Sequence, residues 1–288
     1  MKALVISGGG SKGAFAVGVL SKLINEGEIK YDIIGGTSTG ALMTTFAYFG
    51  KINELKRIYT NISTDKLLTQ NSIRQALDRG YFLDTKGLEK IVREKVTPDI
   101  FERIKSAKLV YFATVCLETG AVVYFHTNEM ETDGDYEEYK IYRHEEYVRA
   151  IMASSNQPIL MPNVEILSRH YVDGGIRENI PIRGALYNGA TEIDVISMTP
   201  KKIEYNFKPG DLLSVISQTI SIATDDVLHN DLELAGRVAK EKGVTIKLYR
   251  PSGKLPIKND LEFNPDDMNK CLNLGIAAYD NPEEILVT

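Results

Sequence analysis

Short apolar runs alternate with segments of helical periodicity along the first 50 residues. Residues 3–6 form an apolar run that predicts a buried strand, and 14–26 carry apolar side chains at helical spacing up to Gly27. Residues 31–34 predict a second strand, and 41–49 predict an apolar helix. Such an alternation is typical of parallel strands joined by right-handed crossovers.

The rest of the chain continues this pattern with less regular spacing. Residues 51–107 predict amphipathic helices, whereas 108–117 and 121–125 predict two strands joined by a turn. An acidic, glycine-containing stretch over 127–139 predicts an exposed loop. Further segments predict a helix over 145–153, strands over 170–173, 193–197 and 244–249, a long helix over 211–242 broken near Asp225, and a helix starting at Asn264. We expect one α/β domain over residues 1–288, because no linker or repeat divides the chain.

Composition narrows the classes of function. Hydrophobic residues make up 43% and charged residues 25% of the chain, as in ordinary globular proteins. A net charge of −5 argues against a nucleic-acid partner and against tight binding to anionic lipid, but it allows a local basic patch. The two cysteines form neither a disulfide framework nor a zinc motif. Without a signal peptide or an apolar run of about 18 residues, the chain is expected to be cytoplasmic.

The first candidate for chemistry is the pentapeptide Gly36-Thr37-Ser38-Thr39-Gly40, which matches Gly-x-Ser-x-Gly. It lies between a predicted strand and a predicted helix, where a sharp turn exposes the serine hydroxyl and glycines avoid clashes. The following helix directs its N-terminus at the site, which favours developing negative charge. Ser38 is therefore a candidate nucleophile, although a plain strand-to-helix turn would share this pattern.

A second glycine cluster covers residues 8–13 and reads Gly-Gly-Gly-Ser-Lys-Gly. Its backbone amides could form an oxyanion hole, or the glycines could simply allow a tight turn. Gly8, Gly10 and Gly13 also satisfy the Gly-x-Gly-x-x-Gly pattern of dinucleotide binding. That use is weakened by Asp32, the candidate ribose-binding acid, which begins its strand rather than ending it.

Asp173-Gly174-Gly175 ends a further predicted strand. We expect the carboxyl ends of strands to face the active crevice, so Asp173 could accept the serine proton. An aspartate that begins a Gly-Gly turn explains the same residues equally well.

A serine-histidine-aspartate triad would require one of the four histidines. His126 ends a predicted strand and is the best placed, His170 lies three residues before Asp173, and His144 and His229 are expected to be exposed. No motif surrounds any of them, and they show no metal-ligand spacing.

Taken together, the three motifs resemble the patatin-like phospholipase family. Ala153-Ser154-Ser155 leading to Pro158, and Asn179-x-Pro181, add to the resemblance. It extends over residues 3–200, whereas 211–288 matches only in helical character and is expected to pack on this core. The resemblance implies an α/β fold, a three-layer α/β/α sandwich with a mostly parallel central sheet.

The resemblance also implies a Ser–Asp dyad without a catalytic histidine. Ser38 would attack the acyl carbonyl, and Asp173 would take the serine proton and then activate water. The amides of Gly8, Gly9 and Gly10 would form the oxyanion hole. The remaining motif residues would support this site, with Lys12 holding the loop or attracting an anion: Ser11, Lys12, Gly13, Gly36, Gly40, Gly174 and Gly175.

The implied substrates are acyl esters of phospholipids, lysophospholipids or neutral glycerolipids, reached by transient contact with a membrane surface. No cofactor or metal is implied. Acyl transfer or thioester hydrolysis on the same scaffold is an alternative, and a non-catalytic nucleotide-binding module is a more remote one. Oligomeric state is not indicated, and whether residues 51–107 form a lid stays open.

Overall fold

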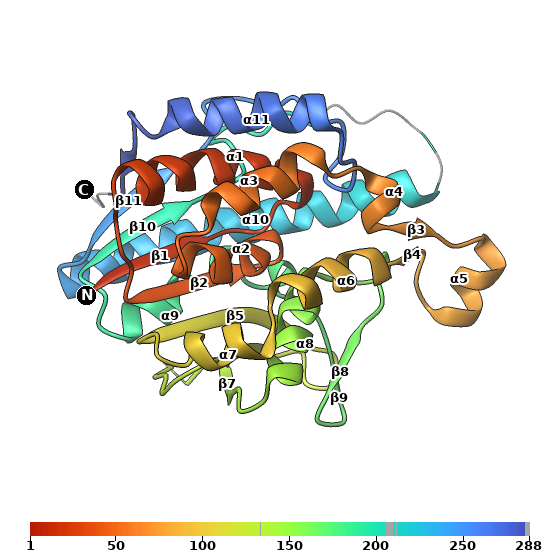
Figure 1. Cartoon of the computed structure of the whole chain (residues 1–288), viewed down its shortest axis with the longest axis horizontal. Coiled ribbons are helices and arrows are strands. Elements are labelled where there is room, and N and C mark those ends of the chain that lie inside the picture. Colours follow the sequence, from red (N-terminus) through yellow and green to blue (C-terminus); the bar gives the residue numbers. More distant parts are fainter. Residues whose placement is uncertain (133, 206–209, 211, 286–288) are drawn as a thin grey trace.

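The computed structural model describes residues 1–132, 134–205, 210 and 212–285. Its main sheet runs through the centre of the molecule in the order β12-β11-β10-β1-β2-β5-β6-β7, and β8 and β9 extend it beside β5 (Figure 1). The strands are β1 (Lys2–Ile6), β2 (Ile33–Thr37), β3 (Thr69–Gln70), β4 (Leu83–Asp84), β5 (Leu109–Cys116), β6 (Val122–His126), β7 (Glu137–Lys140), β8 (Val164–Ile166), β9 (Arg169–Asp173), β10 (Glu192–Ile196), β11 (Thr245–Tyr249) and β12 (Glu283–Glu284).

Five neighbouring strands at the centre, β11, β10, β1, β2 and β5, are all parallel. β1 and β5 are nearly continuous apolar runs because helices cover both faces of the sheet there. The helices are α1 (Gly13–Leu20), α2 (Thr39–Tyr48), α3 (Ile52–Asn61), α4 (Thr64–Leu67), α5 (Ile73–Arg79), α6 (Lys86–Lys95), α7 (Pro98–Ile104), α8 (His144–Ser155), α9 (Ile182–Tyr187), α10 (Leu212–Lys242) and α11 (Pro265–Ala278).

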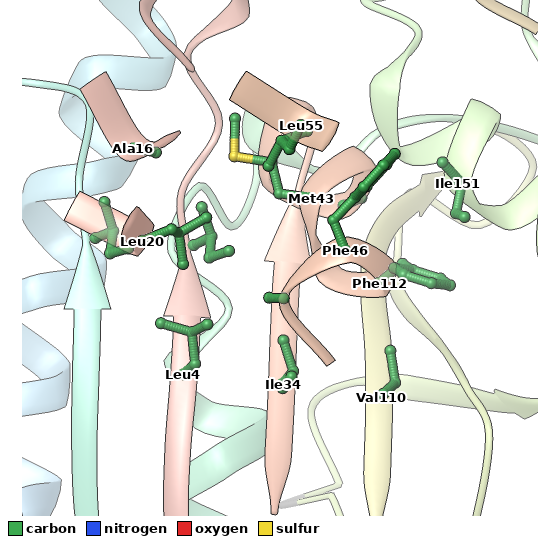
Figure 2. Close-up of a cluster of buried hydrophobic side chains, with 14 of the residues drawn as sticks. Leu4, Ala16, Leu20, Ile34, Met43, Phe46, Leu55, Val110, Phe112 and Ile151 are labelled. Atoms are coloured by element: carbon green, nitrogen blue, oxygen red, sulfur yellow. The ribbon is translucent and has the colours of Figure 1, made fainter. Parts of the chain in front are cut away.

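One core lies between the sheet and the layer that contains α1, α2, α3, α8 and α11. Figure 2 shows Leu4, Ile34 and Val110 pointing from neighbouring strands to the same side, towards Met43 and Phe46 of α2. The other face is covered by α9 and α10, which form a second core with the strand side chains that point the opposite way. The predicted three-layer α/β/α sandwich with a mostly parallel sheet is therefore confirmed.

Two predicted features differ from the structure. The exposed loop predicted over 127–139 contains the start of β7, which forms because its backbone pairs in parallel with β6 and Tyr139 packs against Phe125. The long helix α10 is not broken near Asp225, because this side chain bonds to groups outside the helix and leaves its backbone ladder intact. Two residues of these predicted segments, Asp133 and Asp211, lie outside the described residues.

Candidate active site

Ser38 occupies a sharp turn between β2 and α2 and is 7% exposed. Its backbone dihedrals are φ 56° and ψ −125°, a strained conformation of the kind that presents a nucleophile. The strand runs through Gly35 and Gly36 to Thr37, three residues beyond the predicted 31–34, so the turn is confined to Ser38 itself. A Cβ on Gly36 would lie 2.5 Å from the Gly40 carbonyl carbon, and a Cβ on Gly40 would lie 2.2 Å from the Ile6 carbonyl oxygen, which explains both glycines of the pentapeptide.

The end of α8 holds this strained turn in place. The Ser38 amide donates to Ser154 Oγ at 3.0 Å, and Ser154 Oγ donates to the Ala113 carbonyl at 2.7 Å. Ser155 Oγ donates to the Ser38 carbonyl at 3.3 Å. The two serines carry part of the family resemblance, but their role becomes visible only when the helix end is placed against β2.

Asp173 reaches Ser38 by a route that differs from the expected one. Its strand, β9, is antiparallel to β5, so the argument from shared carboxyl ends of parallel strands was wrong. β5 continues beyond the end of β2, and β9 pairs with that extension. Thr37 pairs with Ala113 and Asp173 pairs with the next residue, Thr114, so β2 and β9 meet end to end along one edge of β5.

The Asp173 side chain is almost fully enclosed, with 4% exposure. Burial raises the pKa of its carboxyl group to about 6, although hydrogen bonds from the Ser38 hydroxyl and the Gly175 amide oppose the rise. The Gly175 amide donates to Asp173 Oδ1 at 2.8 Å, which is the Asx-turn contact that the sequence allowed as an alternative. The turn and the contact with Ser38 therefore coexist.

The glycine loop lies directly against the serine. A Cβ on Gly8 would stand 3.1 Å from Ser38 Cβ. The Gly8 amide is already engaged, because it donates to Asn179 Oδ1 at 2.9 Å. Among the described residues, no acceptor is paired with the amides of Gly9 and Gly10. Of the three predicted oxyanion donors, two are thus free in this structure.

A distant segment at residues 259–260 supports the same loop. The Ser11 amide donates to the Asp260 carbonyl at 2.8 Å, and Lys12 Nζ lies 2.9 Å from Asp260 Oδ1. Burial alone would lower the pKa of Lys12, but attraction to Asp260 outweighs it and the pKa is raised. Lys12 is therefore a charged tether of the loop.

Asn179 is held by α10. Asp231 Oδ2 accepts hydrogen bonds from the backbone N–H groups of Asn179, at 2.7 Å, and Ile180, at 2.9 Å. Burial raises the pKa of Asp231 to about 7, and the two backbone hydrogen bonds oppose the rise. No local pattern around Asp231 indicated this contact, which bridges 52 residues of sequence.

Ser38 lies between two hollows of different character. On one side an apolar pocket is lined by α2, α3, α6 and neighbouring loops: Leu42, Phe46, Leu55, Ile58, Tyr59, Leu67, Leu68, Leu88, Ile91, Val92, Met161, Leu261 and Phe263 are among its lining residues. Lys95, the one lysine in this lining, is paired with Glu54 at 2.7 Å. On the other side a polar cleft is bordered by Asp173, Asn179, Thr224 and Asp225.

The four histidines make their contacts elsewhere. His126 is buried against Glu138 and the Asn128 carbonyl, and His144 contacts the Val96 carbonyl. His170 pairs with Glu118 at 2.6 Å, and His229 contacts its own helix. His144 was expected to be exposed but is half-buried, because its ring contacts the Val96 carbonyl directly after α6.

The described residues contain no group of three or more histidine, cysteine, aspartate or glutamate side chains placed to hold a metal ion. Nor does any described helix combine the length and apolar character needed to cross a membrane.

This sandwich presents a serine on a strained strand-to-helix turn, an arrangement found in acyl hydrolases. The profile of the patatin-like phospholipase family matches residues 4–186, so the chain belongs to this family of lipid acyl hydrolases. A comparison with curated proteins found no match. Among solved structures, VipD from Legionella pneumophila aligns with a TM-score of 0.47 and 11% identity, over 98% of this chain and 67% of the VipD chain.

Proposed function

We propose that the protein hydrolyses carboxylic esters of lipids through an acyl-enzyme formed on Ser38, with Asp173 as the base. The observation that carries the proposal is the position of Ser38. It faces Asp173 and stands between an apolar pocket suited to an acyl chain and a polar cleft suited to the alcohol part of an ester.

The reaction follows from this arrangement. Asp173 accepts the proton of Ser38 while Oγ attacks the acyl carbonyl, and the tetrahedral intermediate collapses with return of that proton to the leaving alcohol. Asp173 then accepts a proton from the water that attacks the acyl-enzyme, and returns this proton to Ser38 Oγ as the bond to Oγ breaks and the acid leaves. The Gly9 and Gly10 amides, which no acceptor engages in the part of the chain that the structure describes, are the proposed oxyanion donors. Gly8 joins them only by giving up its bond to Asn179.

The proposed enzyme uses residues 1–288 as one domain. The family profile ends at residue 186, yet Asp231 and Asp260 support the site from beyond it. α11 also packs closely on α1: a Cβ on Gly275 would lie 2.0 Å from the Phe15 carbonyl oxygen. We expect truncation after residue 200 to abolish activity.

The pH dependence of the reaction tests the base. Asp173 must be ionised to accept a proton, and its pKa is raised to about 6. We therefore expect kcat/KM for a soluble nitrophenyl ester to be constant above this pKa and to fall about tenfold per pH unit below it. A profile that stays flat down to the pKa of an ordinary aspartate would contradict the role of Asp173.

The apolar pocket is tested by narrowing it. Leu42 of α2 lines the pocket shortly after Ser38. We expect Leu42→Trp to lower kcat/KM for nitrophenyl laurate about tenfold more than for nitrophenyl butyrate, because only the longer chain needs the obstructed space. Leu42→Met is the control of similar volume. Equal losses on both esters would show that the acyl chain lies elsewhere.

A further inference from the structure

Residues 69–84 form a small projection that stands away from the rest of the molecule. The two short strands β3 and β4 pair as a separate sheet, and α5 lies between them in sequence. Figure 1 shows α5 projecting from the body at the end where α4 and α6 meet this sheet.

The projecting helix presents apolar side chains to solvent. Ile73 and Leu77 are 76% and 80% exposed and lie four residues apart, so they share one face, whereas Ala76 is buried. The helix is well defined at both ends, by a capping box between Ser72 and Gln75 and by Gly80 in the left-handed conformation. A capped helix therefore holds two large apolar side chains in water.

This projection is joined to the wall of the apolar pocket. Leu67 and Leu68 precede it, Leu88 follows it, and all three line the pocket that reaches Ser38. The Leu83 amide donates to the Leu160 carbonyl at 2.7 Å, next to Ile159, which is 57% exposed. The segment from which α5 projects therefore adjoins the wall of the pocket.

The charge of α5 differs from that of the whole chain. The helix itself carries two arginines, Arg74 and Arg79, and one acid, Asp78, a net charge of +1, whereas the chain carries −5. Arg79 also lies 3.9 Å from Asp84 of β4, so Arg74 is the arginine of α5 next to the exposed Ile73 that carries the charge argument. A second protein is a poor occupant, because two side chains on a seven-residue helix offer far less than the roughly 800 Å² that each partner buries in a stable complex. Apolar side chains flanked by arginines suit a lipid surface.

We propose that α5 anchors the protein to a phospholipid bilayer with anionic lipid, by inserting Ile73 and Leu77 among the acyl chains. This inference rests on the proposed function, because the anchor brings the apolar pocket next to the membrane lipids whose ester bond the enzyme is proposed to cleave. It is distinct from catalysis, because Ile73 and Leu77 are not among the residues that line the pocket.

Flotation with vesicles of phosphatidylcholine and phosphatidylglycerol tests the anchor. The assay uses protein carrying Ser38→Ala, so that binding is measured without turnover. We expect Ile73→Asp with Leu77→Asp to reduce the bound fraction at least about tenfold, because two apolar side chains no longer leave water. Leu274→Asp, at a 45% exposed leucine of α11, is the matched control and should bind normally.

With Ser38 present, the double variant should retain its rate on nitrophenyl butyrate and lose it on vesicles. Equal flotation of the double variant, or failure of the parent protein to float, would overturn the anchor while leaving hydrolysis of the soluble ester intact. So would sedimentation showing a dimer that the double variant abolishes. Failure of the proposed function would instead appear as unchanged hydrolysis in Ser38→Ala, with flotation unaffected.

Discussion

Replacing Ser38 with alanine is expected to lower kcat for a soluble ester by about 10⁴-fold or more, because the variant lacks the hydroxyl on which the proposed acyl-enzyme forms. The substitution removes one hydroxyl and leaves the backbone bonds of the turn to Ser154 and Ser155 in place. The variant should therefore fold normally, and the loss should appear in kcat.

A fluorophosphonate probe with peptide mapping checks the same point independently of substrate choice. The parent protein should carry the label on Ser38, and the Ser38→Ala protein should carry none. Ser21→Ala, at a serine whose hydroxyl donates to the Gly18 carbonyl one turn earlier, is the matched control and should label fully. Label on another residue, or activity retained by Ser38→Ala, would contradict the proposed nucleophile.

Asp173→Asn is expected to lower kcat by about 10³-fold, the scale of general-base catalysis. Asparagine keeps the size of the side chain and an oxygen that can accept the Gly175 amide, so the turn survives. It cannot take the Ser38 proton. The activity that remains should lack the inflection near the raised pKa of about 6.

The control for this variant is Asp194→Asn. Asp194 is also buried, at 2% exposure, but it accepts a hydrogen bond from Tyr31 at 2.7 Å, at a different place in the sheet. We expect this change to affect the unfolding temperature more than kcat. If both substitutions lowered kcat equally, the effect of Asp173→Asn would reflect lost packing rather than a lost base.

Much of the fold was predictable from local pattern. The strands and helices of the first 50 residues follow from apolar periodicity, because burial on one or two faces dictates the spacing of apolar side chains. The turn at Ser38 was equally local, since Gly36 and Gly40 are needed where backbone approaches backbone. The polar β7 was missed because backbone pairing, and not apolar pattern, makes it a strand.

The sequence by itself determined the individual strands of the central sheet, the serine turn and the glycine loop, because each depends on neighbours along the chain. Only the tertiary structure decided how they meet. Asp173 faces Ser38 because β5 extends beyond the end of β2, and β9 pairs in antiparallel orientation with the edge of β5 that is left unpaired there. The Gly8 amide is engaged and Lys12 is tethered because Asn179 and Asp260 arrive from distant segments. Such contacts depend on which distant elements pack together, and the apolar periodicity within one segment does not indicate its partners.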